Sequence, residues 1–197
     1  KFGSAVFAGC RSLPTLVIDD TLLHFEDVTG NVKLPLVAHK IGKGVFCEEN
    51  GLQSIDIATG YEYVDDNAFE NCKALNAVNL PNGLLGFGFS VFSGCTAIER
   101  IEIPQTVQSL ADSLFYGCSE LREVALHEGL IIVGYNTFAH CKSLLSIQLP
   151  DSLKHIMDCA FEECTSLTNV QIGPCLEAIK RSAFARCTAL KSVAIAD

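Results

Sequence analysis

The sequence predicts a repeat solenoid, a β-rich array in which short parallel strands stack turn upon turn. Two observations carry this prediction. A phenylalanine recurs seven times at intervals of 23 residues without a gap, and a cysteine and then a leucine or isoleucine follow it at fixed distances. Such a period is typical of stacked repeats, because a unit of this length cannot bury its apolar face alone. The phenylalanines are Phe46, Phe69, Phe92, Phe115, Phe138, Phe161 and Phe184.

Each repeat unit contains one short strand. Three residues after the phenylalanine stands a cysteine in six of the seven units, Glu49 being the exception, and three residues later a leucine or isoleucine opens the phrase L-x-x-V-x-I. The alternation in this phrase places two apolar residues on one face and a polar residue on the other, as in a strand. Proline ends the strand at Pro81, Pro104 and Pro150, because it removes a backbone donor. We expect regular units from about residue 35 to 197.

The N-terminal part is less regular. Repeat positions are matched by Phe2, Phe7, Cys10 and Leu13. Leu16 and Ile18 align with the strand phrase and Leu23 with the phenylalanine position, but the spacing breaks across residues 19–34. One interpretation of this stretch is a repeat shortened by seven residues, and the alternative is a loop inserted on one rim of the array. With either interpretation, residues 1–197 are expected to form a single solenoid of about eight to nine turns.

The composition is that of a folded protein. The chain has 197 residues, of which 49% are hydrophobic and 19% are charged, and its formal net charge is −9. The acidic balance and the lack of a Lys/Arg cluster argue against nucleic acid or an anionic lipid surface as the main partner. No apolar run reaches the roughly 18 residues needed to span a membrane, and the start has no signal-peptide pattern. Because the sequence does not begin with Met, we expect a fragment or a mature form.

Three repeat phrases carry a resemblance to a known family. The segments AFENCKALNAVNLP, VFSGCTAIERIEIP and AFEECTSLTNVQIG resemble the leucine-rich repeats of the BspA-like class, A-F-x-x-C-x-x-L-x-x-V-x-I-P-x-x-V-x-x-I-G. The resemblance covers nearly the whole chain and weakens only across residues 19–34. The last position of the motif keeps Gly42, Gly88 and Gly134, but is Asp65, Ala111, Met157 and Lys180 in the other turns.

The resemblance implies a fold and a role. The fold is a right-handed leucine-rich-repeat array, curved, with a parallel sheet on its concave face and short extended segments opposite. Members of the family are mostly surface or secreted adhesion modules of bacteria and of single-celled eukaryotes, and they bind proteins. We therefore expect a protein partner, and a cell-surface or secreted location.

The outward face of the strands is the first candidate binding surface. Polar and mainly small residues line it, and an ordered face of a curved array suits recognition through many modest contacts. Its most charged part is Arg100 with Glu102 and Glu123. We name the whole row of outward-facing strand residues the concave column; it consists of Asp56, Asn79, Arg100, Glu102, Glu123, Ser146, Gln148, Asn169 and Gln171.

A second candidate surface is aromatic. Three residues before the repeat phenylalanine the chain usually has a polar residue, yet Phe89 and Tyr135 occupy this position. Together with Tyr116, they are candidates for exposed anchors on the convex side, and we name the three the convex aromatic patch. The alternative is that these side chains are scattered surface aromatics without a common role.

No catalytic residue, metal site or cofactor is predicted. The chain has no C-x-x-C motif, and its five histidines fall at unrelated repeat positions. His140 precedes Cys141, but the repeat pattern points this thiol into the core, away from a base. Disulfides along the cysteine row are disfavoured, because stacked parallel side chains hold their Cβ atoms too far apart. Cys47, Cys159 and Cys175 lie off this row and are candidates for free thiols.

The sequence thus predicts a non-enzymatic protein-binding module for adhesion or recognition at a cell surface. The alternative is a structural or scaffolding subunit of a larger multi-protein assembly, for which an intracellular or organellar location stays open. The sequence stops directly after a strand, without a polar capping unit. An uncapped array exposes an apolar cross-section and a strand edge, so we expect a longer parent chain or neighbouring subunits to cover the ends.

Overall fold

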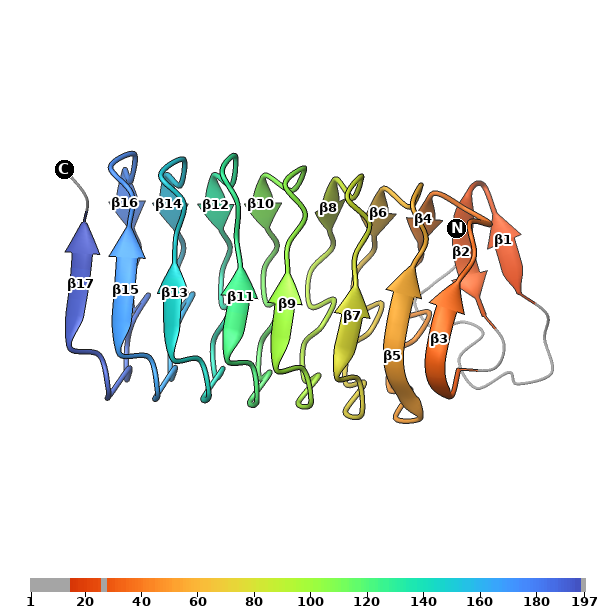
Figure 1. Cartoon of the computed structure of the whole chain (residues 1–197), viewed down its shortest axis with the longest axis horizontal. Coiled ribbons are helices and arrows are strands. Elements are labelled where there is room, and N and C mark those ends of the chain that lie inside the picture. Colours follow the sequence, from red (N-terminus) through yellow and green to blue (C-terminus); the bar gives the residue numbers. More distant parts are fainter. Residues whose placement is uncertain (1–14, 26–27, 196–197) are drawn as a thin grey trace.

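Two ladders of strands run along the molecule (Figure 1). The strands of one ladder are longer, and those of the other are shorter except for β2 at its start. The structure is a computed structural model, and it describes residues 15–25 and 28–195. In Figure 1 the long strands stand side by side with all arrows in the same direction, and the short strands lie behind them. The long strands are β3 (Gly30–Leu34), β5 (Leu52–Ile57), β7 (Ala77–Asn79), β9 (Arg100–Glu102), β11 (Glu123–Ala125), β13 (Ser146–Gln148), β15 (Asn169–Ile172) and β17 (Ser192–Ile195). The short strands are β2 (Thr21–His24), β4 (Lys40–Ile41), β6 (Tyr63–Val64), β8 (Gly86–Phe87), β10 (Ser109–Leu110), β12 (Ile132–Val133), β14 (His155–Ile156) and β16 (Ala178–Ile179).

The repeat period becomes the register of both ladders. In the long ladder Ile147 lies opposite Val170, and in the short ladder Val133 lies opposite Ile156, each pair being 23 residues apart. The pairing is parallel, so equivalent side chains of successive turns share one face. No helix occurs among the described residues, and the fold is a parallel β-solenoid of about seven turns. The predicted fold class is confirmed. The expected eight to nine turns included residues 1–14, which lie outside the described part of the chain.

The repeat phenylalanines form a continuous stack through the core. Neighbouring rings are nearly parallel, with centroids 4.9–5.6 Å apart and interplanar angles of 3–16°. The rings from Phe46 to Phe161 are fully buried. Such stacking adds to the free energy gained from burial, and it requires the turns to keep one register.

The cysteine row binds each turn to the one before it. Each thiol donates a hydrogen bond of 2.8–3.1 Å to the backbone carbonyl of the phenylalanine 26 residues earlier in the sequence. The row comprises Cys72, Cys95, Cys118, Cys141, Cys164 and Cys187. All described cysteines are free, including Cys47, Cys159 and Cys175, and the sulfur protons in the row are used for hydrogen bonds between turns.

The predicted alignment of Leu16 and Ile18 with a repeat strand is wrong, and the rest of that alignment, Phe2, Phe7, Cys10 and Leu13, lies outside the described residues. These residues belong to β1 (Leu16–Ile18), which pairs antiparallel with β2 and not with a long strand. Asp19 and Asp20 form the two-residue turn between them, and both have positive φ, 48° and 60°. Two such residues in sequence reverse the chain in a tight hairpin. Apolar alternation predicts the strand but does not encode this reversal.

Residues 19–34 supply both strands of one short turn. Strand β2 pairs parallel with β4, and β3 pairs parallel with β5. The predicted place of Leu23 in the phenylalanine row is wrong, because Leu22 lies opposite Ile41 and the ring of Phe25 packs on Phe46 with centroids 6.2 Å apart. Counting back by 23 residues fails here because the turn is shorter than the others.

Candidate functional site

The structure aligns the residues of the concave column along the long strands. The long strands stand side by side (Figure 1), and because they pair in register within each sheet, polar residues of successive turns occupy opposed positions. The opposed pairs are Asp56 with Asn79, Arg100 with Glu123, Ser146 with Asn169, and Gln148 with Gln171. Glu102 lies opposite Ala125, which leaves its carboxylate without a polar neighbour in register.

Hydrogen bonds and opposite charges link the side chains of this column. The amide of Asn79 donates to Asp56 Oδ1 over 2.6 Å, and Arg100 Nη2 lies 3.8 Å from Glu123 Oε2. Further along, the hydroxyl of Ser192 donates to Asn169 Oδ1 over 3.0 Å. The guanidinium and the carboxylate of the Arg100–Glu123 pair are both largely exposed, 81% and 68%, so this pair contributes little to stability and is available to a partner.

His127 is a member of this surface that the sequence did not reveal. Its Nε2 atom lies 3.4 Å from Glu102 Oε1, and the imidazole is 28% exposed. The histidine stands 25 residues after Glu102, which is one turn and two further residues. The repeat period could not find this contact, because the two side chains occupy different positions of the repeat.

The strand face is hollowed where the long ladder is interrupted. No strand pairing joins β7 to β9 or β11 to β13, so the long strands form three separate sheets. A pocket of about 390 Å³ lies over the first interruption and is lined by Asn79, Arg100, Glu102 and Glu123 around the apolar Val78 and Ile101. Pockets of about 410 Å³ and 300 Å³ continue the hollow surface, and Gln148 lines both.

The convex aromatic patch is not one contiguous row. Phe89 and Tyr135 are 50% and 43% exposed and follow the short strands β8 and β12, on the side opposite the long strands (Figure 1). Tyr116 is 40% exposed, but it occupies a different repeat position and packs edge-on against His140, with ring centroids 5.0 Å apart. The structure therefore brings Phe89 and Tyr135 into a common repeat position and separates Tyr116 from them.

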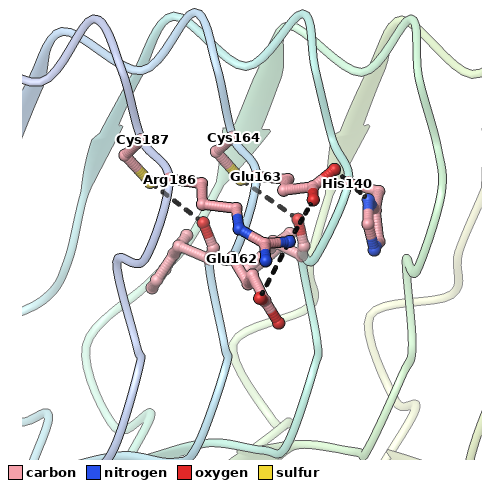
Figure 2. A network of polar contacts seen from close by, with 8 residues as sticks. His140, Glu162, Glu163, Cys164, Arg186 and Cys187 are labelled. Carbon is pink, nitrogen blue, oxygen red and sulfur yellow. Dashed lines mark hydrogen bonds and ion pairs between the residues drawn. The ribbon is translucent and has the colours of Figure 1, made fainter.

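A polar network that the sequence analysis missed lies on the last three turns (Figure 2). His140 Nδ1 lies 2.9 Å from one carboxylate oxygen of Glu163, and Arg186 Nη1 lies 2.7 Å from the other. Arg186 Nη1 is also 3.8 Å from Glu162 Oε1. The hydrogen bond from Arg186 lowers the pKa of Glu163. His140, Glu163 and Arg186 follow each other at intervals of 23 residues, and all three have positive φ. This spacing is the sequence feature that could have revealed the network.

His140 and Cys141 do not form a nucleophile and its base. Cys141 is fully buried and its thiol donates to the carbonyl of Phe115 over 3.1 Å, while His140 faces Glu163. Burial raises the pKa of the Cys141 thiol well above its ordinary value, which disfavours the reactive thiolate.

Within residues 15–25 and 28–195, no group of three or more His, Cys, Asp or Glu side chains is arranged to hold a metal ion. The described residues contain no helix, and therefore none that could cross a membrane.

Comparison with known proteins identifies the repeat. The model of the BspA type leucine rich repeat region, which contains six copies, matches residues 39–142 and 109–197. No curated protein matches the sequence. Among the solved structures that match this chain are three from bacteria.

The leucine-rich repeat protein TpLRR of T. pallidum superposes with a TM-score of 0.80 at 22% identity, over 88% of this chain and 84% of that one. A leucine-rich repeat protein from Eubacterium ventriosum gives a TM-score of 0.79 at 24% identity over 88% of this chain, which spans only 47% of that protein. The pneumococcal vaccine antigen PcpA gives 0.53 at 15% identity, over 91% of this chain and 66% of that one. At these identities the similarity concerns the fold, and the family follows from the repeat model: the chain belongs to the BspA-type leucine-rich repeat family.

Proposed function

We propose that this protein is a non-enzymatic binding module that recognises a protein partner through the concave column. The observation that carries the proposal is the pocket of about 390 Å³ in which Asn79, Arg100, Glu102 and Glu123 surround an apolar floor. Exposed opposite charges around apolar surface favour a partner with complementary charges, because charge complementarity sets specificity and speeds encounter.

The family and the fold support this role. Leucine-rich repeat solenoids are generally non-enzymatic, and their ordered strand face offers a large surface for a partner. We propose a cell-surface or secreted location and a role in adhesion or recognition, which the family to which the chain belongs supports. We further propose that the whole chain acts as a single binding domain, since its strands share continuous register along each sheet.

Crosslinking with mass spectrometry tests this proposal. The native protein is crosslinked mildly in the cells that produce it, and the crosslinked peptides are assigned to repeat positions. We expect links from the concave column, around Arg100 and Glu123, to one partner protein. Links that avoid the long strands altogether would contradict a role of this face in binding.

A structural subunit of a larger assembly is the second candidate, and two exposed aromatic residues on the side of the short strands favour it. Phe89 and Tyr135 are 50% and 43% exposed. Exposed aromatic side chains are typical of surfaces that contact neighbouring proteins. In the crosslinking experiment, links from the segments that follow β8 and β12 to several constant neighbours would support this second role over the first.

A further inference from the structure

A two-turn alternation marks the row of residues three positions before each repeat phenylalanine. Aspartate occupies this row in every second turn, and a cation or an aromatic residue stands in the turns between. The row follows the short strands, on the side opposite the concave column (Figure 1). In chain order it reads Lys43, Asp66, Phe89, Asp112, Tyr135, Asp158 and Arg181.

Each aspartate of the row reaches into the following turn. Asp66 Oδ1 accepts a hydrogen bond of 3.1 Å from the backbone N–H of Phe89, and Asp112 Oδ1 accepts one of 2.9 Å from the N–H of Tyr135. The carboxylates therefore have fixed positions, and their second oxygens remain available to a cation.

Glycine makes room for these carboxylates. A Cβ atom at Gly88 would lie 2.4 Å from Asp66 Oδ1, and one at Gly134 would lie 2.7 Å from Asp112 Oδ1. Gly42, Gly88 and Gly134 stand directly before Lys43, Phe89 and Tyr135, so the glycines alternate in the same way as the row. The arrangement of an aspartate, a glycine and an aromatic residue thus occurs in two copies, 46 residues apart.

The first copy holds a lysine of the protein itself. Lys43 Nζ lies 2.5 Å from Asp66 Oδ2 and 5.3 Å from the centroid of the Phe89 ring. The ammonium group thus has a carboxylate and an aromatic face as partners at the same time, a combination that favours a cation. The hydrogen bond to Asp66 also raises the pKa of Lys43, which keeps it charged.

The second copy has the same partners but no lysine. Phe89 stands where the first copy has Lys43, so the residue before Asp112 in the row is aromatic. Asp112 is exposed, and no described Lys, Arg or His forms an ion pair with it. Phe89 and Tyr135, on its two sides, are 50% and 43% exposed. Asp112 is therefore an exposed carboxylate between two exposed aromatic residues of the row, and no ammonium group of the described chain lies against it.

We infer that Asp112, with Phe89 and Tyr135, binds the cationic side chain of a lysine or arginine in a basic segment of a protein partner. The net charge of −9 favours the approach of such a segment. The identity of the ligand as a protein segment rests on the proposed binding function. The site itself does not depend on the concave column, which lies on the opposite face.

A titration monitored by NMR tests the site. The probe is N-acetyl-lysine amide, the uncharged control probe is N-acetyl-norleucine amide, and the ring signals of Tyr135 and Phe89 are observed. We expect saturable shifts of these signals with the lysine probe only. Equal shifts with both probes would contradict a cation site, and no shift with either would contradict any site here. A lysine-induced shift at Tyr135 would stand even if no partner used the concave column, so the two proposals can fail separately.

Substitutions identify the groups responsible. Asp112→Asn keeps an oxygen that can accept the N–H of Tyr135 but removes the charge, and we expect lysine binding to weaken about fivefold or more. Glu99→Gln removes the same charge at an exposed residue of another row and should leave binding unchanged. Phe89→Lys gives the second copy a lysine at the position that Lys43 has in the first copy. We therefore expect the Tyr135 signals to shift toward their probe-bound positions without any probe. Unchanged binding in Asp112→Asn, or unshifted Tyr135 signals in Phe89→Lys, would overturn the inference.

Discussion

The thiol of Cys118 donates a hydrogen bond of 3.1 Å to the backbone carbonyl of Phe92, in the turn before it. The same carbonyl accepts the backbone N–H of Cys95 over 3.1 Å, so it is saturated although it is buried. A buried carbonyl that is only partly satisfied costs free energy, and cysteine supplies a donor small enough for the core. The recurrence of cysteine therefore has a reason in hydrogen bonding as well as in packing.

Replacing this thiol should destabilise the array. For Cys118→Ala we expect the free energy of unfolding to fall by about 1–2 kcal/mol, because the sulfur contacts and one hydrogen bond are lost. Denaturant unfolding measures the change. Cys187→Ala removes the same group from a partly exposed position of the last turn and should cost less. A neutral Cys118→Ala variant would show that the hydrogen bond contributes nothing.

The cysteines should differ in their reactivity toward alkylating reagents. Cys175 is exposed, whereas Cys118 is fully buried and burial raises the pKa of its thiol to about 12. Since the thiolate is the reactive form, iodoacetamide should modify Cys175 quickly in the native protein and leave Cys118 unmodified. Peptide mass spectrometry measures the modification, and denatured protein, in which every cysteine should react, is the control. Rapid native modification of Cys118 would contradict its place in the core.

Gly134 should resist replacement by alanine. A Cβ atom there would lie 2.6 Å from the carbonyl oxygen of Leu110, which is backbone and cannot move aside cheaply. We expect Gly134→Ala to lower the free energy of unfolding by about 1–3 kcal/mol. Gly83 has no heavy atom within 4 Å of the corresponding position, so Gly83→Ala should change stability by less than about 0.5 kcal/mol. Equal effects of the two substitutions would argue against the close approach of these turns.

The network around Glu163 should make stability depend on acid pH. The folded protein lowers the pKa of Glu163 from its ordinary value of 4.5, chiefly through the hydrogen bond from Arg186. The charged form is therefore favoured in the folded state, so its contribution is complete above pH 4.5 and is lost as the pH falls through the lower folded pKa. The melting temperature should fall less steeply below pH 4.5 in Glu163→Gln than in the wild type, as measured by thermal unfolding at a series of pH values. Glu99→Gln should keep the wild-type slope, and identical slopes in all three proteins would contradict this account.

The regular part of the fold could be predicted because the repeat period is also the strand register. Once Phe115 and Phe138 are recognised as equivalent, the strand phrases must align, and the polar faces of Arg100 and Glu123 follow without further information. The inward cysteines followed in the same way, since parallel stacking brings equivalent positions together.

The remainder depends on contacts between positions that are not equivalent. The hairpin of β1 and β2 depends on the backbone conformation of Asp19 and Asp20. The alternation of apolar residues does not show whether two strands pair parallel or antiparallel. His127 meets Glu102 at an offset that no single repeat contains. The two-turn row around Asp112 was visible in the sequence, but the positions had to be compared in alternate turns for its period to appear.

The most direct test of the central claim is a binding measurement with charges exchanged on the strand face. The partner found by crosslinking is titrated against the wild type and against the double variant Arg100→Glu/Glu123→Arg, which keeps the net charge and the opposed pair while inverting its direction. The control is Glu99→Gln. Recognition through the concave column predicts that the double variant binds at least tenfold more weakly, equivalent to about 1.4 kcal/mol, while the control binds normally. Equal affinity of the wild type and the double variant would contradict the claim.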